Sequence, residues 1–138
     1  MKEVKYIPLD LVKADKNPNI IWKVKDVSQD KRGNVLYRVV AAEDNDAFIY
    51  LYEHQIASVP LTPEILEKNG WFEDSFLDSH KSFYQNDRRY PSLHGQNTQN
   101  GYAFDIDIGE TNIMTNVKYI HELQHLLFGL GINHEMEV

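Results

Sequence analysis

The sequence predicts an α+β protein, and three patterns support this fold class. Apolar residues alternate at the period of a β-strand through residues 20–59, a proline-started helical segment follows at 62–70, and a second helical pattern spans 116–131. We therefore expect an N-terminal antiparallel β-meander or small SH3-like barrel, then a short helix, a β-hairpin and a C-terminal amphipathic helix. At 138 residues, the chain divides into a small β domain at 1–60 and an α+β region at 61–138, packed as one compact unit.

Composition limits which cellular compartment and which kinds of partner are expected. There is no cysteine, which suits a reducing compartment, and residues 1–13 lack the apolar run of a signal peptide. The longest uninterrupted apolar run, residues 47–52, is too short to cross a membrane. The net charge of −7 argues against binding nucleic acid through its phosphates. We expect a cytoplasmic protein with a protein partner and no membrane contact; the oligomeric state stays open.

Four strands are predicted in the first half, at residues 20–27, 35–42, 47–53 and 54–59. Polar segments at 28–34 and 43–46 supply turns between them, with Gly33 free to adopt a positive φ. Residues 1–17 are weakly patterned, and no strand is predicted there. One alternative for the aromatic-rich strand that holds Phe48 and Tyr50 is the lining of a peptide groove, but such residues are expected to contribute first of all to the core.

A short helix follows, with Thr62 as its N-cap and Pro63 in the first helical position, where a missing N–H costs nothing. Asn69 and Gly70 end it. Trp71 and Phe72 are expected to bury their rings against this helix.

The region from 73 to 101 is polar, with one predicted strand at 81–85 and a mobile loop at 92–101. Residues 102–108 alternate cleanly, which places Phe104 and Ile106 on one face of a strand and Asp105 and Asp107 on the other. A turn at 109–110 and a short strand at 111–115 are expected before the last helix.

The last helix is predicted at residues 116–130, with Thr115 or Asn116 as its cap and glycines at 129 and 131 to end it. At about 100° per residue, one side of this helix is apolar and packs on the core. Four residues form that side: Ile120, Leu123, Leu127 and Leu130. The opposite side carries His121, Glu122 and His125, which are expected to face solvent.

These three polar residues form the sequence His-Glu-Leu-Gln-His, which matches a zinc-hydrolase motif. Histidines four apart on a helix can bind one Zn²⁺, so His121 and His125 would be ligands and Glu122 the general base. The third ligand is the weak point, because the spacing that places another histidine six residues later meets Gly131. His134 is the nearest substitute. No cofactor is expected otherwise, since a polar helix face of this kind is ordinary for a surface helix.

Two segments carry a family resemblance. VPLTPEILEKNGW (59–71) and VKYIHELQHLLFGLG (117–131) resemble segments of small proteins from Bacteroidetes genomes and their phages, a group to which no activity is assigned. The resemblance implies a β domain that leads into a PLT helix and a closing helix of the pattern YxHxLQxLxFxL. That pattern includes His121 and Gln124 but does not require Glu122 or His125, so in this group the zinc motif is incidental.

The leading prediction is a non-enzymatic accessory or protein-interaction protein of phage or mobile-element type. The alternative is a zinc-dependent, metallopeptidase-like hydrolase that uses His121, His125 and Glu122, with His134 as the candidate third ligand. A weaker alternative is a nucleic-acid-associated small-barrel module, suggested by Arg88 and Arg89 beside Tyr90.

Overall fold

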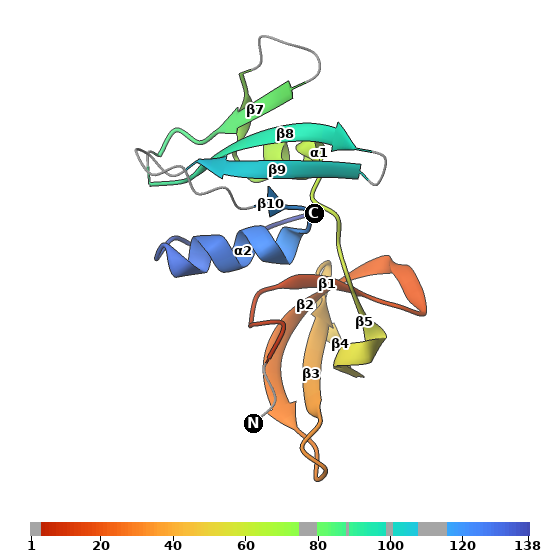
Figure 1. Cartoon of the computed structure of the whole chain (residues 1–138). Helices are drawn as coiled ribbons and strands as arrows, with labels where there is room; N and C mark the ends of the chain where they lie inside the picture. Colours follow the sequence, from red (N-terminus) through yellow and green to blue (C-terminus); the bar gives the residue numbers. More distant parts are fainter. Residues whose placement is uncertain (1–3, 75–79, 88, 99–100, 108–115) are drawn as a thin grey trace.

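Two antiparallel sheets make up most of the computed structural model, which describes residues 4–74, 80–87, 89–98, 101–107 and 116–138. Each sheet has five strands, and the two follow each other along the chain (Figure 1). The α+β prediction is confirmed.

The first sheet is an open meander to which a fifth strand returns. Its order is β4-β3-β2-β1-β5, and β4 and β5, at the two ends, do not pair with each other in the described part of the chain. The sheet therefore agrees with the predicted meander. These strand pairings do not close it into a barrel. The strands are β1 Leu11–Ala14, β2 Asn17–Gln29, β3 Val35–Ala41, β4 Asp44–Tyr52 and β5 Ile56–Ser58, with a 3-10 turn, η1, at Glu53–Gln55.

The four predicted strands of this half are present, but β1 was not predicted. Only four residues long, β1 lies between β2 and β5 and places Val12 in the core. A strand this short gives too few alternations to be recognised from its sequence.

The second sheet is larger than the predicted hairpin and runs in chain order, β10-β9-β8-β7-β6. Its strands are β6 Phe72–Glu73, β7 His80–Tyr84, β8 Ser92–Thr98, β9 Gly101–Asp107 and β10 Asn116–Val117. The strands predicted at 81–85 and 102–108 correspond to β7 and β9. Phe104 and Ile106 are buried as expected, while the turn at 109–110 and the strand at 111–115 fall outside the described residues.

The prediction of a loop at 92–101 is wrong, because Ser92–Thr98 forms β8, between β7 and β9, and Gly101 begins β9. Leu93 is fully buried, and Gly95 lies against the ring of Phe104. A Cβ at position 95 would approach that ring to 2.6 Å, so the strand needs glycine here for close packing. The polar composition with glycine thus suggested a loop, although the segment forms a strand whose inner face is tightly packed.

The first helix, α1 Pro63–Lys68, matches its prediction. Thr62 caps it, its Oγ1 accepting a hydrogen bond from the N–H of Ile65 at 3.3 Å. Trp71 is buried as expected, but Phe72 is not: it lies on the two-residue edge strand β6 and is 45% exposed.

The last helix, α2 Ile120–Gly129, begins four residues later than predicted. Asn116 and Val117 instead pair with β9. The chain then makes backbone hydrogen bonds with residues 59–61, in which the N–H of Leu61 donates to Lys118 and the N–H of Ile120 to Val59, each at 2.9 Å. The apolar period continues back through Val117, but strand pairing decides its conformation.

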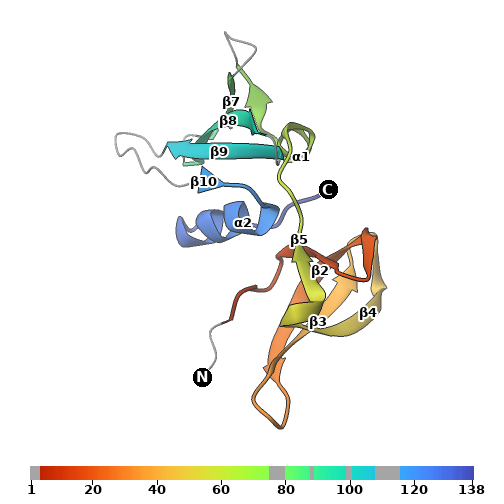
Figure 2. The ribbon, with the colours of Figure 1, turned by 45° about the vertical axis from the view of Figure 1, so that its right-hand side comes forward.

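Helix α2 lies on the side of the second sheet that faces the first sheet (Figures 1 and 2). Ile120, Leu123 and Leu127 are buried in the core beneath that sheet, which also takes in Leu11 of β1. Leu130, predicted on the same apolar side, follows the helix as its C-cap and is 38% exposed. A separate core lies within the first sheet around Tyr6, Val24 and Tyr37.

Candidate functional site

The histidine motif of α2 does not face solvent as predicted, since His121 is buried and 6% exposed. The segment that precedes β1 lies against it, and the Tyr6 ring meets the imidazole edge-on at a centroid distance of 5.1 Å. Tyr119 stacks on the same ring at 6.0 Å. Helical periodicity could not anticipate this cover, because it comes from residues more than 110 positions away in the chain.

Burial disfavours the charged form of the His121 ring. Burial lowers its pKa below the ordinary value, and the charge of Asp10 only partly opposes that shift. Its Nδ1 is buried and has no hydrogen-bond partner among the described residues.

His125 forms a polar contact between α2 and the segment before β1. Its Nε2 lies 2.5 Å from Oδ2 of Asp10, a fully buried carboxylate. The N–H of Ile7 donates to the same oxygen at 2.9 Å. The other oxygen of Asp10, Oδ1, is buried without a partner in the described part of the chain.

Gln124, between the two histidines, is fully buried and makes hydrogen bonds with the backbone at two places, residues 9–11 and residue 134. Its Oε1 accepts from the N–H of Leu11 at 2.9 Å. Its Nε2 donates to the carbonyls of Leu9 at 2.7 Å and His134 at 2.9 Å. Leu9 has a φ of +77°, a conformation uncommon for a residue with a side chain, so this contact stabilises a strained turn.

Glu122, the candidate general base, is engaged at the start of the helix. Its Oε1 accepts hydrogen bonds from the N–H groups of Lys118 and Tyr119, both at 3.0 Å. These bonds satisfy donors that would otherwise lack partners at the helix start, which is the role of the glutamate in a capping box.

His134, the candidate third metal ligand, makes contacts of its own. His134 contacts the carbonyl of Pro8 through Nε2 at 3.2 Å and packs against the Phe128 ring. Among the residues that the structure describes, no three histidine, aspartate or glutamate side chains are grouped so that they could hold a metal ion. The donor set around α2 therefore does not fit a zinc centre.

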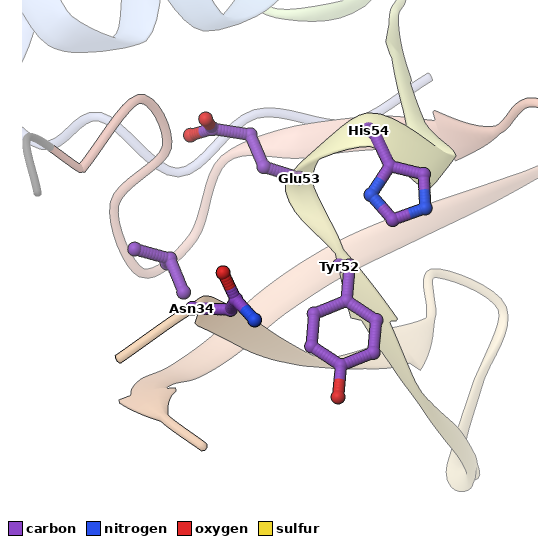
Figure 3. Close-up of a pocket in the computed structure, with 5 residues that line it drawn as sticks. Asn34, Tyr52, Glu53 and His54 are labelled. Atoms are coloured by element: carbon purple, nitrogen blue, oxygen red, sulfur yellow. The ribbon is translucent and has the colours of Figure 1, made fainter. Parts of the chain in front are cut away.

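A hollow of about 350 Å³ lies where β4 ends and η1 begins. The rings of Tyr52 and His54 are nearly parallel there at 5.9 Å, and Figure 3 shows the Glu53 carboxylate turned away from both. Glu53 accepts from the hydroxyl of Tyr37 at 3.0 Å, and burial, with help from this carboxylate, raises the pKa of Tyr37 to about 12. Glu53 is thus part of the internal structure of the first sheet.

The aromatic-rich strand β4 was expected to contribute first of all to the core, which is wrong for Phe48 and Tyr50. Phe48 and Tyr50 are 53% and 55% exposed, and Ile49 between them is 37% exposed. The only available signal was the aromatic alternation itself, which is equally typical of a buried strand.

The other polar residues considered in the sequence, the arginine pair and the two aspartates of β9, show no arrangement typical of a functional site among the described residues. Arg89 forms an ion pair with Asp87 at 2.7 Å, and Arg88 lies outside the described residues. Asp105 and Asp107 face away from the core side of β9, as predicted, although Oδ1 of Asp107 is buried without a partner among the described residues.

No helix of the described chain is long and apolar enough to cross a membrane. Comparisons with protein families, curated proteins and solved structures find no match for the chain.

Proposed function

We propose that the protein is a non-enzymatic accessory protein of phage or mobile-element type that acts by binding another polypeptide. This proposal depends on one observation, which is that residues of the histidine motif make structural contacts within the protein. Glu122 caps α2, and His125 pairs with the buried Asp10. A general base has to reach a metal-bound water, whereas the Glu122 carboxylate is directed to its own helix terminus.

The exposed apolar residues of β4 support the binding half of the proposal. Contiguous exposed apolar side chains on a small protein mark contact sites more often than isolated ones do. Phe48 and Tyr50 project from the same face of β4 with their rings in edge-to-face contact, Ile49 projects from the opposite face, and all three are exposed on an outermost strand of the first sheet. An outermost strand can accept an extended segment by backbone pairing, which is a common mode of peptide recognition.

Metal analysis of protein purified without chelator separates this proposal from the hydrolase alternative. We expect far less than one zinc per chain, and His125→Gln should change stability without changing metal content. About one zinc per chain, lost in both His121→Gln and His125→Gln, would support the hydrolase and contradict the proposal.

Selection from a display library of random extended peptides tests the binding half. Peptides that are enriched on the wild-type protein should no longer bind the Tyr50→Glu variant. They should still bind Phe128→Glu, the control, in which a similarly exposed aromatic residue of α2 is changed. If no peptide is enriched and the chain also fails to associate with itself, the binding role is refuted.

A further inference from the structure

Residues 132–138, which we call the crossing segment, pass between α1 and the first sheet without becoming a strand of either sheet (Figures 1 and 2). The segment follows Gly131, whose φ of +72° turns the chain out of α2. Among the described residues, positions 133–138 make no hydrogen bond from backbone to backbone. Side chains from the rest of the molecule therefore hold this part of the chain in place.

The side chain of Asn69, at the end of α1, binds the main chain of the crossing segment at two points. Its Oδ1 accepts from the N–H of Glu137 and its Nδ2 donates to the carbonyl of Glu137, both at 2.7 Å. Lys68 donates through Nζ to the carbonyl of Val138. Asn69 is itself fixed, because its own carbonyl accepts from Nε2 of Gln85 at 2.8 Å. Contacts of this kind bind an extended peptide through its backbone, whatever its side chains.

Two consecutive side chains of the crossing segment have specific partners. Met136 is 3% exposed and belongs to the core beneath the second sheet. Oε1 of Glu135 lies 2.8 Å from Nζ of Lys23 on β2, and this contact lowers the pKa of the Glu135 carboxyl. The molecule thus selects a carboxylate followed directly by a long, unbranched apolar side chain.

The crossing segment does not fill the space in which it lies. A cleft of about 650 Å³ remains between the segment and its walls, a size typical of ligand sites. The walls contribute the ammonium groups of Lys23 and Lys68 against one carboxylate, that of Glu43. In a chain of net charge −7, this locally basic lining favours an acidic occupant.

From these contacts we infer that the cleft is a peptide-binding groove, that the crossing segment occupies it in cis, and that an extended acidic peptide with glutamate directly before methionine replaces the segment in trans. The segment itself defines this chemistry, since it shows which backbone and side-chain groups the groove binds. A segment without backbone pairing opens locally while the sheets stay folded, which makes the exchange feasible. The groove is a different surface from β4, so the inference goes beyond the proposed function.

Alkylation of a single cysteine tests the exchange in the full chain. Met136→Cys places the only cysteine of the chain at a buried position of the crossing segment. The synthetic peptide INHEMEV, which has the sequence of residues 132–138, should raise the rate of reaction with iodoacetamide by about tenfold or more, up to a plateau. The peptide INHEDEV should leave the rate unchanged. Ala14→Cys, whose parent residue is 8% exposed in the other core, is the control and should react at the same rate with and without peptide. A rate at position 136 that ignores INHEMEV, or that rises equally with INHEDEV, overturns the inference.

A charge exchange tests the same groove with Met136 intact. Fluorescence anisotropy compares labelled INHEMEV with INHKMEV, in which lysine replaces the glutamate that corresponds to Glu135. The wild type should prefer INHEMEV by about fivefold, and Lys23→Glu should prefer INHKMEV. The ratio of two affinities in one protein does not depend on how firmly the crossing segment competes, because the occupied fraction reduces both affinities equally.

Two results of the anisotropy measurement would also overturn the inference: a preference that Lys23→Glu does not change, and no binding of either peptide to either protein. Tyr50→Glu should bind INHEMEV as tightly as the wild type does, since Tyr50 lies on β4 and not in the groove. A failure of the groove is therefore distinguishable from a failure of the binding role proposed for β4.

Discussion

Replacement of Gln124 by methionine tests whether the motif of α2 is structural. The side chain keeps nearly the same volume, so the change measures lost hydrogen bonds and not a cavity. The buried N–H of Leu11 loses its acceptor, at a cost of about 1–3 kcal/mol. The carbonyls of Leu9 and His134 are in partly buried contacts, and each adds about 0.5–1 kcal/mol. We expect a total loss of about 2–5 kcal/mol in the free energy of unfolding.

Urea unfolding followed by circular dichroism measures this loss. With a slope of about 2 kcal/mol per molar urea, the midpoint should fall by about 1–2.5 M. Gln29→Met, on an exposed position of β2, is the control and should change stability by less than about 0.5 kcal/mol. A loss at position 124 no larger than that of the control would refute the structural role of this side chain.

Three further predictions follow from individual contacts. Glu122→Ala should lower the free energy of unfolding by about 0.5–1 kcal/mol, because the helix cap is lost. Glu122→Gln should retain most of this stability. Equal losses for the two variants in urea unfolding would contradict the capping role. His121 has a lowered pKa in the folded state, so the stability it contributes is complete above its ordinary pKa of about 6.5 and is lost as pH falls through the folded value. Melting temperatures at several pH values should therefore fall less steeply on the acid side in His121→Phe, and parallel curves would exclude this origin. Gly95→Ala should cost about 1–3 kcal/mol, because the Phe104 ring is fully buried and cannot move away; an unchanged melting temperature would show that β8 has room for a methyl group.

Local signals were sufficient wherever a residue's neighbours in sequence decide its conformation. Thr62 and Pro63 predicted the start of α1 because a cap and a first-turn proline act within one helical turn. Alternation predicted β3 and β9 because one face of each strand is buried.

Signals failed where distant residues decide. Val117 fits the apolar period of α2, yet pairing with Phe104 makes it part of a strand. His121 was expected in solvent because its own helix places it opposite the core, and Tyr6 then covers it. Nothing in the sequence around Asp10 predicted that its carboxylate would be buried, because its partner His125 comes from α2, far away in the chain.

Strand β1 belongs to both halves of the molecule, and this has a consequence for how the protein unfolds. Its backbone pairs with β2 and β5, while the Leu11 side chain lies in the core beneath the second sheet. Melting of either half removes apolar contacts from the other, so the two sheets should lose structure in one cooperative transition. A fragment cut near residue 60 would expose Leu11 and leave the Asp10 carboxylate without its imidazole, and we expect neither piece to persist in isolation.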